Sequence, residues 1–325
     1  MVLYGILVAL SAVIVGVYVV WNLTVRPPEI PQEPDPAPPA GSGSQAAEPV
    51  EQEQPAGRQR REDVYNFVLL GRDRESANTD TIIVVSYDVA NQKVGMISIP
   101  RDTAVNRDWR KDPKINGAYA GAGVDVLKEE IEQTFGIPID YYIYVDLKGF
   151  VALVDELEGV DVYIPEEMNY DDPYQDLHIH FTKGPRHLNG QEAMEVVRFR
   201  HNNDGTGYGT EDIGRIGTQQ AFLKAVAKQL LQIGNVKNIP ALVDIFYTYV
   251  KTDLTTGNLV WLGNEALNIG TENIHFATLP GDGSGYYNKQ SVYVLDAQAT
   301  CDLVNEALNP YNEALTLEDM DILVP

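Results

Sequence analysis

The stretch that decides the fold is residues 64–103, with the sequence VYNFVLLGRDRESANTDTIIVVSYDVANQKVGMISIPRDT. It contains three apolar runs rich in β-branched residues, at 64–70, 81–87 and 94–99, which we predict to be buried strands. The short polar sequence 88–92 separates the second run from the third and has the length of a hairpin turn. The stretch therefore predicts a sheet with at least one antiparallel pair.

The hairpin gives a geometric prediction for four polar residues. In an antiparallel pair the start of one strand lies beside the end of the next. Asp80 opens the second strand, and Arg101 and Asp102 follow the third. The loop that carries Asp73 leads into the second strand, so we expect all four residues at one rim of the sheet.

This rim is a candidate metal–phosphate site. Carboxylates are the ligands that hard divalent ions such as magnesium require, and the planar fork of arginine matches phosphate oxygens. A surface ion-pair network at the loop ends would use the same residues, and the sequence leaves that alternative open.

Farther along the chain, helical and strand patterns alternate. An apolar stripe over 124–135, followed by a glycine and a proline, predicts an amphipathic helix. Further strands are predicted at 141–145 and 160–164, with a short helix at 149–157 between them. This alternation indicates the α/β class, with a central mixed β-sheet flanked by helices on both faces.

The segment 188–200 adds two cationic residues. Asn189, with Glu192 three residues later, resembles a capping box that opens a short helix. Arg198 and Arg200 lie at the end of that helix. If the chain is extended there, the two guanidiniums share a face, which is unfavourable unless an anion lies between them. Simple solvation of both arginines is the alternative.

A longer helix is predicted at 212–232 from its apolar stripe. Arg215 and Gln219 share one face of this helix near its N-terminal end, where free amides and the helix dipole favour anions. We therefore predict a phosphate pocket there. The glycine-containing loop 201–209 could cover a substrate.

Three other features do not predict a functional site. His178 and His180 form an isolated pair; zinc would need further ligands, and no Cys/His cluster lies nearby in the sequence, so we do not expect a metal there. The glycine-rich segment 281–285 lacks the lysine and context of a nucleotide P-loop, so we expect an ordinary loop. Cys301, the one cysteine, lies in a predicted helix at 297–308 and is expected to be a buried structural thiol.

Composition excludes one class of partner. The chain has 325 residues, 44% of them apolar, and a formal net charge of −23. We expect no nucleic-acid partner, because a phosphate backbone is held by excess lysine and arginine. A local cluster of arginines can still bind a single pyrophosphate in an acidic protein.

The first part of the chain, residues 1–24, is predicted to be a transmembrane anchor. Residues 2–23 carry no charged side chain, and Trp21 lies near the end of the run. A cleaved signal peptide is the rival, but its basic start and small-residue cleavage site are absent. Arg26 after the span, taken alone, favours an outside N-terminus. We nevertheless expect the folded domain on the extracytoplasmic side, because the sequence that follows resembles an extracytoplasmic protein.

Residues 25–61 are predicted to be a disordered linker, rich in proline, glycine and serine. Arg58, Arg60 and Arg61 close the linker, where they could contact anionic headgroups or be solvated. The folded domain is then expected over 62–325.

Taken in order, the motifs of this domain resemble those of the LytR–CpsA–Psr (LCP) family. Each match is weak alone, but the ordered set is specific, and it covers about residues 64–230. The matching segments are 66–73, 79–81, 98–103, 114–119, 150–155 with 159–161, 188–190, 198–200, and 212–215 with 219–220.

The resemblance implies a central mixed sheet flanked by helices and a deep apolar tunnel for a polyprenyl chain. It implies a Mg²⁺- or Mn²⁺-dependent phosphotransferase in the cell membrane. This enzyme would transfer a glycopolymer phosphate (teichoic acid, capsular polysaccharide or similar) from a polyprenyl pyrophosphate carrier to a peptidoglycan sugar hydroxyl. It assigns magnesium coordination to Asp73 and Asp80, and pyrophosphate contacts to Arg101, Arg198, Arg200, Arg215 and Gln219.

Two positions depart from the family pattern. Asn78 and Thr218 stand where arginine is common, so the pocket should be less cationic than the pattern suggests. Arg72 or Arg74 could compensate from the loop between the first two strands.

For the reaction itself we expect Arg101 to stabilise charge on the leaving phosphate and Asp102 to accept the proton of the attacking hydroxyl. Two alternatives remain open. One is a non-catalytic protein that binds or scaffolds the polyprenyl-pyrophosphate glycan. The other is a lipid pyrophosphatase that uses water as acceptor.

Overall fold

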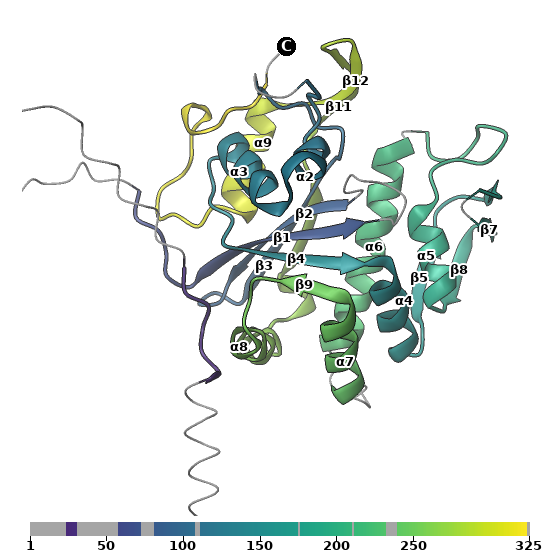
Figure 1. The fold of residues 1–325 in the computed structure, drawn as a ribbon, viewed down its shortest axis with the longest axis horizontal. Coiled ribbons are helices and arrows are strands. Elements are labelled where there is room, and N and C mark those ends of the chain that lie inside the picture. The colour runs from purple at the N-terminus through teal and green to yellow at the C-terminus, as the bar shows by residue number, and fades with distance from the viewer. Residues whose placement is uncertain are drawn as a thin grey trace, which may run out of the picture.

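The computed structural model describes residues 24–30, 58–72, 81–107, 111–174, 176–209, 211–231 and 239–323. Its central feature is a six-stranded sheet in the order β10-β3-β2-β1-β4-β9 (Figure 1). These strands are β1 (Val64–Arg72), β2 (Thr81–Asp88), β3 (Lys93–Ile99), β4 (Tyr141–Asp146), β9 (Val250–Thr252) and β10 (Ile274–Thr278). Pairs β1–β2, β2–β3 and β4–β9 are antiparallel, whereas β1–β4 and β3–β10 are parallel, so the sheet is mixed, as predicted.

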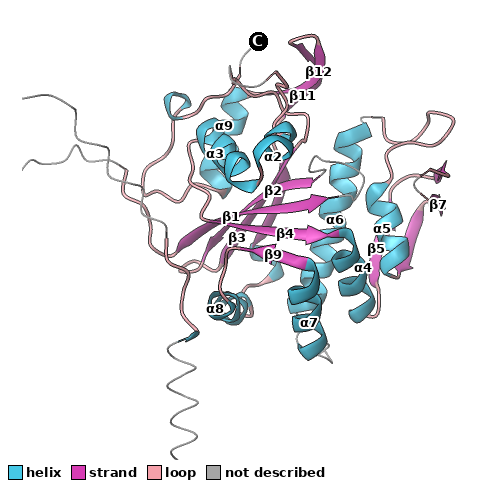
Figure 2. Cartoon of the chain, in the orientation of Figure 1, coloured by secondary structure: helices cyan, strands magenta, loops and turns pink. Residues whose placement is uncertain are grey.

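Helices cover both faces of this sheet. Side chains alternate between the faces along a strand, and on β1 Leu70 is buried under α3 (Val124–Phe135) and α9 (Ala297–Ala307). Phe67 lies on the opposite face, in the cluster that includes α8 (Thr256–Ala266). Figure 2 shows α2, α3 and α9 on one side of the strands and α8 on the other. The predicted α/β architecture is confirmed.

A second group of elements packs at one end of the sheet and has its own apolar core. It contains α4 (Leu147–Glu156), α5 (Gly190–Arg198), α6 (Glu211–Leu231), and the two-stranded pairs β5 (Val160–Ile164) with β8 (Gly184–Leu188) and β6 (Met168–Asp172) with β7 (Leu177–Phe181). The remaining elements are α2 (Asn116–Ala122), α7 (Ile239–Tyr249), β11 (Gly281–Tyr287), β12 (Gln290–Leu295) and the 3₁₀ turns η2 (Thr271–Asn273) and η3 (Leu317–Asp319).

Local sequence signals account for several element boundaries. The 124–135 helix is found with the predicted ends, and Gly136 closes it in the left-handed conformation, with φ of 67°. The capping box of Asn189 and Glu192 opens α5 as predicted. The 149–157 helix starts earlier than predicted, at Leu147, because the carboxylate of Asp146 accepts from the Lys148 amide and caps it.

The prediction of a loop at 281–285 is wrong. These residues belong to β11, which pairs with β12 through a bulge between Asp282 and Gly285. Glycine is needed here because a Cβ on Gly285 would approach the Val294 side chain within 2.4 Å. Backbone pairing with β12 therefore overrides the low strand propensity of the segment.

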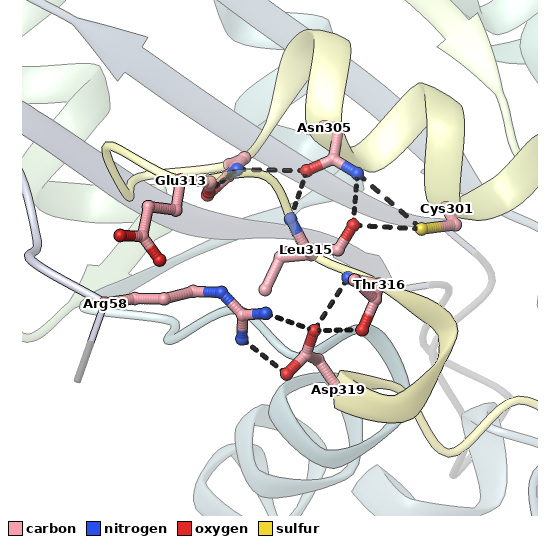
Figure 3. A network of polar contacts seen from close by, with 8 residues as sticks. Arg58, Cys301, Asn305, Glu313, Leu315, Thr316 and Asp319 are labelled. Carbon is pink, nitrogen blue, oxygen red and sulfur yellow. Dashed lines mark hydrogen bonds and ion pairs between the residues drawn. The ribbon is translucent and has the colours of Figure 1, made fainter. Parts of the chain in front are cut away.

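Cys301 is buried in α9, as predicted, and burial raises the pKa of its thiol. Its Sγ lies 3.5 Å from the carbonyl oxygen of Leu315, and the Asn305 amide bonds both the N–H and the C=O of that residue (Figure 3). Asp319 accepts from the Thr316 amide at 2.7 Å and forms a two-point ion pair with Arg58. The segment after α9 is therefore fastened to both α9 and the start of the domain.

The three arginines that close the predicted linker all pair with the folded domain. Arg58 pairs with Asp319, Arg60 with the buried Asp140 at 2.5 Å, and Arg61 with Asp88 at 2.5 Å. The expectation that they are solvated or face headgroups is therefore wrong, because each has a carboxylate partner within the domain.

A short N-terminal segment, 24–30, also contacts the domain. The Arg26 carbonyl accepts from the Asn258 side chain at 3.1 Å, and the Glu29 carbonyl accepts from the Tyr141 hydroxyl at 2.5 Å. The predicted anchor at 1–24 lies outside the described residues apart from its last residue, and so does the linker between 31 and 57. Within the part of the chain that the structure describes, no helix combines the length and apolar character needed to cross a bilayer.

Candidate functional site

A cavity of about 710 Å³ lies at the end of the central sheet, between the sheet and the α4–α5–α6 group. The five residues predicted to contact pyrophosphate all line it. They are Arg101, Arg198, Arg200, Arg215 and Gln219. The sequence-based expectation that they share one pocket is met, whereas their role in phosphate binding stays a prediction.

Arg101 is placed by the turn that follows β3. Ile82 of β2 pairs with Ile99, so this turn lies beside the start of β2, as the hairpin predicted. The buried Thr103 hydroxyl donates to the Pro100 carbonyl at 2.6 Å, and the Asn116 amide donates to the Arg101 carbonyl at 3.2 Å. Both bonds fix the backbone on either side of the arginine.

Arg198 and Arg200 reach the cavity because the chain becomes extended where α5 ends. Phe199 has β-region torsions, so residues on either side of it share a face. Its own ring is 1% exposed and packs edge-on against Tyr208 at a centroid distance of 5.3 Å. The buried phenylalanine therefore holds both arginines toward the cavity.

Arg215 and Gln219 come from α6, and Arg215 is 6% exposed. The Gln219 side-chain amide donates to the Val197 carbonyl at 3.1 Å, which ties α6 to the end of α5. The neighbouring Gln220 amide lies within hydrogen-bond distance of Ser98, Ala277 and Thr278, at 2.7–3.1 Å. These two glutamines fix the helix against α5 and against the β3–β10 edge of the sheet.

Thr218, which departs from the family pattern, has a partner of its own. Its hydroxyl lies 2.6 Å from the Tyr208 hydroxyl in a buried contact, and burial raises the pKa of this tyrosine. A Cβ on Gly214 would approach the Tyr208 ring within 2.4 Å, so glycine is needed there. In this chain the hydrogen-bonded pair of Thr218 and Tyr208 stands where the family pattern has an arginine.

Much of the rest of the cavity wall is apolar. Phe222 and Val226 follow Arg215 and Gln219 along the same side of α6, and Phe150 of α4 packs on Phe222 at a centroid distance of 4.9 Å. The step from Arg215 to Val226 corresponds to roughly 16 Å along a helix at 1.5 Å per residue. The cavity is therefore cationic toward the start of α6 and apolar farther along it.

Asp102 does not line this cavity. Its carboxylate lies 3.3 Å from the Lys114 ammonium and 3.8 Å from Nε of Arg101. It is thus beside the arginine, as predicted, but is also engaged with Lys114, the first residue of the matching segment 114–119, to which no role had been assigned.

The proposed metal ligands Asp73 and Asp80, like Asn78 and Arg74, lie outside the described residues, and so does the side chain of Arg72. Gly71 and Thr81 pair with each other across β1 and β2 and both line the cavity. The strand ends on either side of the undescribed segment 73–80 are therefore part of the site.

Sequence reasoning missed one charged residue of the cavity, Asp146, and included His201 only as the first residue of the loop 201–209. Asp146 ends β4, which pairs in parallel with β1 so that Asp146 is opposite Arg72. An acidic residue between a strand and a helix was the available signal, but which strand lies beside β1 could not be known from the sequence.

The electrostatics of the cavity differ from those of the whole protein. Among the described residues that line it there are four arginines and one carboxylate, that of Asp146, in a chain with a net charge of −23. Guanidiniums that are partly removed from water bind phosphate oxygens strongly. The arrangement suits a phosphorylated molecule that has a long apolar part.

Comparison with known proteins identifies the class. The LytR_cpsA_psr family model matches residues 40–309, and the chain belongs to this family.

The chain is also similar to individual members of this family. The chain is 33% identical over 245 residues to polyisoprenyl-teichoic acid–peptidoglycan teichoic acid transferase TagU of Bacillus cereus, covering 74% of this chain and 77% of TagU. It is 30% identical over 220 residues to regulatory protein MsrR of Staphylococcus aureus, covering 66% of this chain and 64% of MsrR. It therefore spans slightly less than two thirds of the length of MsrR. The crystal structure of Bacillus subtilis TagV has a TM-score of 0.64 at 25% identity, over 81% of this chain and all of that one.

Proposed function

We propose that this protein transfers a glycopolymer phosphate from a polyprenyl pyrophosphate carrier to a sugar hydroxyl of peptidoglycan. The observation that carries the proposal is the single cavity in which four arginines and an apolar wall meet. The name of its relative TagU, a teichoic acid transferase, supports the same reaction. Teichoic acid is accordingly the first polymer to test, and capsular polysaccharide the second.

The arginines would bind the pyrophosphate and neutralise the charge that builds on the leaving phosphate. The acceptor hydroxyl attacks the phosphorus that bears the glycan. The bond from that phosphorus to the bridging oxygen breaks, and prenyl monophosphate leaves. Arg215 should contribute most because it is 6% exposed, and charge interactions are stronger away from water.

Asp102 is the proposed acceptor of the hydroxyl proton, because its carboxylate lies beside Arg101. Lys114, at 3.3 Å, would hold the Asp102 carboxylate in place. The apolar side chains of α4 and α6 would hold the prenyl chain and exclude water from the phosphates.

Magnesium or manganese would be held by Asp73 and Asp80. The fit is supported by chemistry, since carboxylates are the preferred ligands of these ions, and by Gly71 and Thr81, which flank segment 73–80 and line the cavity. When bound, such an ion supplies further neutralisation of phosphate charge.

We also propose that the domain lies on the extracytoplasmic side of the cell membrane, held by a single span at residues 1–24. The uncharged apolar run over 2–23 and the extracytoplasmic nature of peptidoglycan support this location.

The test is transfer from a radiolabelled polyprenyl-pyrophosphate-linked glycan to peptidoglycan in the presence of magnesium. Arg215→Met should lower the rate by about 10²–10³. Arg186→Met is the matched control, because Arg186 is an exposed arginine of β8 that does not line the cavity, and its rate should equal that of the wild type.

Product identity separates the proposal from its rivals. Label bound covalently to peptidoglycan supports transfer. Label released as free glycan phosphate indicates a pyrophosphatase, and tight binding with no product indicates a binding or scaffold protein. Full transferase activity in folded Arg215→Met would refute the role given to the arginines.

A further inference from the structure

The hairpin formed by β6 and β7 carries a cluster of polar side chains on its outer face. Asp171 pairs with His178 across the two strands, and Asn169 pairs with His180. Because side chains alternate along a strand, these four residues share one face. All four are exposed, whereas the opposite face of β7 is buried.

The two imidazoles converge on one carboxylate oxygen. Nδ1 of His178 lies 2.5 Å from Oδ1 of Asp171, and Nε2 of His180 lies 3.2 Å from the same atom. Ligand atoms of the three residues all lie within 4.8 Å of one another. The two histidines alone lack the further ligands that zinc needs, and the cross-strand aspartate supplies a third.

The ring of His180 also has a hydrogen-bond partner on its other nitrogen, whereas that of His178 has only a longer contact. Nδ1 of His180 lies 2.8 Å from Oδ1 of Asn169, and Nε2 of His178 lies 3.7 Å from Asp176. With the Asn169 oxygen as acceptor, the proton of a neutral His180 is on Nδ1, and the lone pair of Nε2 faces the carboxylate. Two acceptors that face each other are stabilised by a cation between them. Metal-binding histidines are oriented in this way by a partner on the second nitrogen.

The backbone of the hairpin is held rigidly from one side. Asn202 accepts from the Asn169 amide at 2.6 Å, and Asn203 accepts from the Asp171 amide at 2.7 Å while donating to its carbonyl at 3.0 Å. Asn202 and Asn203 follow Arg200 in the chain. The cluster therefore lies on a preformed strand beside the arginine segment.

We propose that Asp171, His178 and His180 bind one borderline divalent transition-metal ion, with Zn²⁺ as the reference ion and water in the fourth position. Two imidazoles and a carboxylate are a ligand set that suits zinc and disfavours magnesium. Zinc bonds of about 2.0–2.2 Å in a tetrahedron place ligand atoms roughly 3.3 Å apart. The His180 contact, at 3.2 Å, already has this length, and the His178 contact, at 2.5 Å, would have to lengthen by less than about 1 Å.

Such an ion would fasten β6 to β7 on the outer face of the hairpin. The inner face contributes Tyr170 and Leu177 to the large cavity. Bound metal would therefore stabilise one wall of the cavity without being part of the reaction proposed above.

The test is a zinc titration of the tag-free full-length chain in detergent, by calorimetry after removal of metals with a chelator. The titration is done in an excess of Mg²⁺, which would occupy the site proposed at Asp73 and Asp80, and under these conditions the wild type should bind one equivalent of zinc. Asp171→Asn and His178→Gln should each weaken binding at least tenfold. Asn169→Ala should weaken it by about 10–100-fold, although it removes no ligand. His187→Gln is the matched control, since His187 is an exposed histidine that also contacts an aspartate, Asp161, at 2.8 Å.

A second measurement uses only the wild type, so it does not depend on whether the variants fold. Hydrogen exchange of the wild type should show slower exchange of the β6 and β7 amides on addition of zinc, and no change in α3. The proposal is overturned if the wild type binds no zinc, which would mean that the cluster is an ion pair with a protonated histidine. It is also overturned if Asp171→Asn binds as tightly as the wild type, or if His187→Gln weakens binding as much as His178→Gln.

Discussion

Replacing Glu130 with glutamine should destabilise the domain strongly, because it removes one partner of a buried ion pair. Nε of Arg107 lies 2.8 Å from Oε1 of Glu130, and the two side chains are 6% and 1% exposed. Arg107 follows the segment that carries Arg101, so this pair joins that segment to α3. Breaking a buried pair costs about 3–5 kcal/mol.

The lower end of that range applies here, because Arg107 keeps a contact of 2.7 Å with Asp321. A loss of about 3 kcal/mol is a large share of a typical stability of about 5–15 kcal/mol, but it leaves the protein folded. The melting temperature should fall by about 6–12 °C, at roughly 2–4 °C per kcal/mol.

Urea unfolding followed by circular dichroism measures the effect. Glu129→Gln is the control, since Glu129 is exposed on the same helix, and a surface change there should stay within about 0.5 kcal/mol. The double variant Arg107→Met/Glu130→Leu should recover most of the loss, because neither charge is then left unpaired. If Glu130→Gln and Glu129→Gln unfold at the same urea concentration, the pair does not stabilise the fold as argued.

Three further changes test other contacts. Gln220→Leu should lower transferase activity at least tenfold while the protein stays folded. The reason is that α6, which carries Arg215, loses its contacts with β3 and β10. Retained activity would contradict this. Asp319→Asn should lower the melting temperature at neutral pH. Hydrogen bonds from a guanidinium hold the pKa of this carboxyl below its usual range, so the difference from wild type should persist above about pH 4 and vanish as the pH falls further; a difference that does not change with pH would be evidence against it. Gly149→Ala should cost about 1–3 kcal/mol in urea unfolding, since its Cβ would lie 2.4 Å from Cβ of Tyr249, and Tyr249→Gly, which removes that Cβ, should relieve the clash.

Those parts of the fold and site that depend on local patterns could be predicted from the sequence. The β2–β3 hairpin placed Arg101 beside the start of β2, and the capping box at Asn189 located the helix that presents Arg198. Both signals extend over a few residues, and their geometry follows from the period of a strand or a helix.

The remaining features depend on pairings between distant segments. β10 lies beside β3 although about 175 residues separate them. Asp146 reaches the cavity because β4 pairs with β1. Which distant strands pair is decided by the packing of the whole domain, so this pairing cannot be predicted from any short stretch of the sequence.

The two contacts of the N-terminal region with the domain have a consequence for the proposed membrane anchor. Residues 24–30 rest on α8 and β4, whereas Arg58, Arg60 and Arg61 are bound at other points of the same body. A Cβ on Gly257 would lie 1.5 Å from the Thr24 carbonyl oxygen, so the contact of residues 24–30 with α8 requires glycine at position 257. Because both ends of 31–57 are attached to the same domain, a change in the length of that stretch should not alter the distance between the domain and the proposed span at 1–24. That distance is instead set at Thr24, the first docked residue.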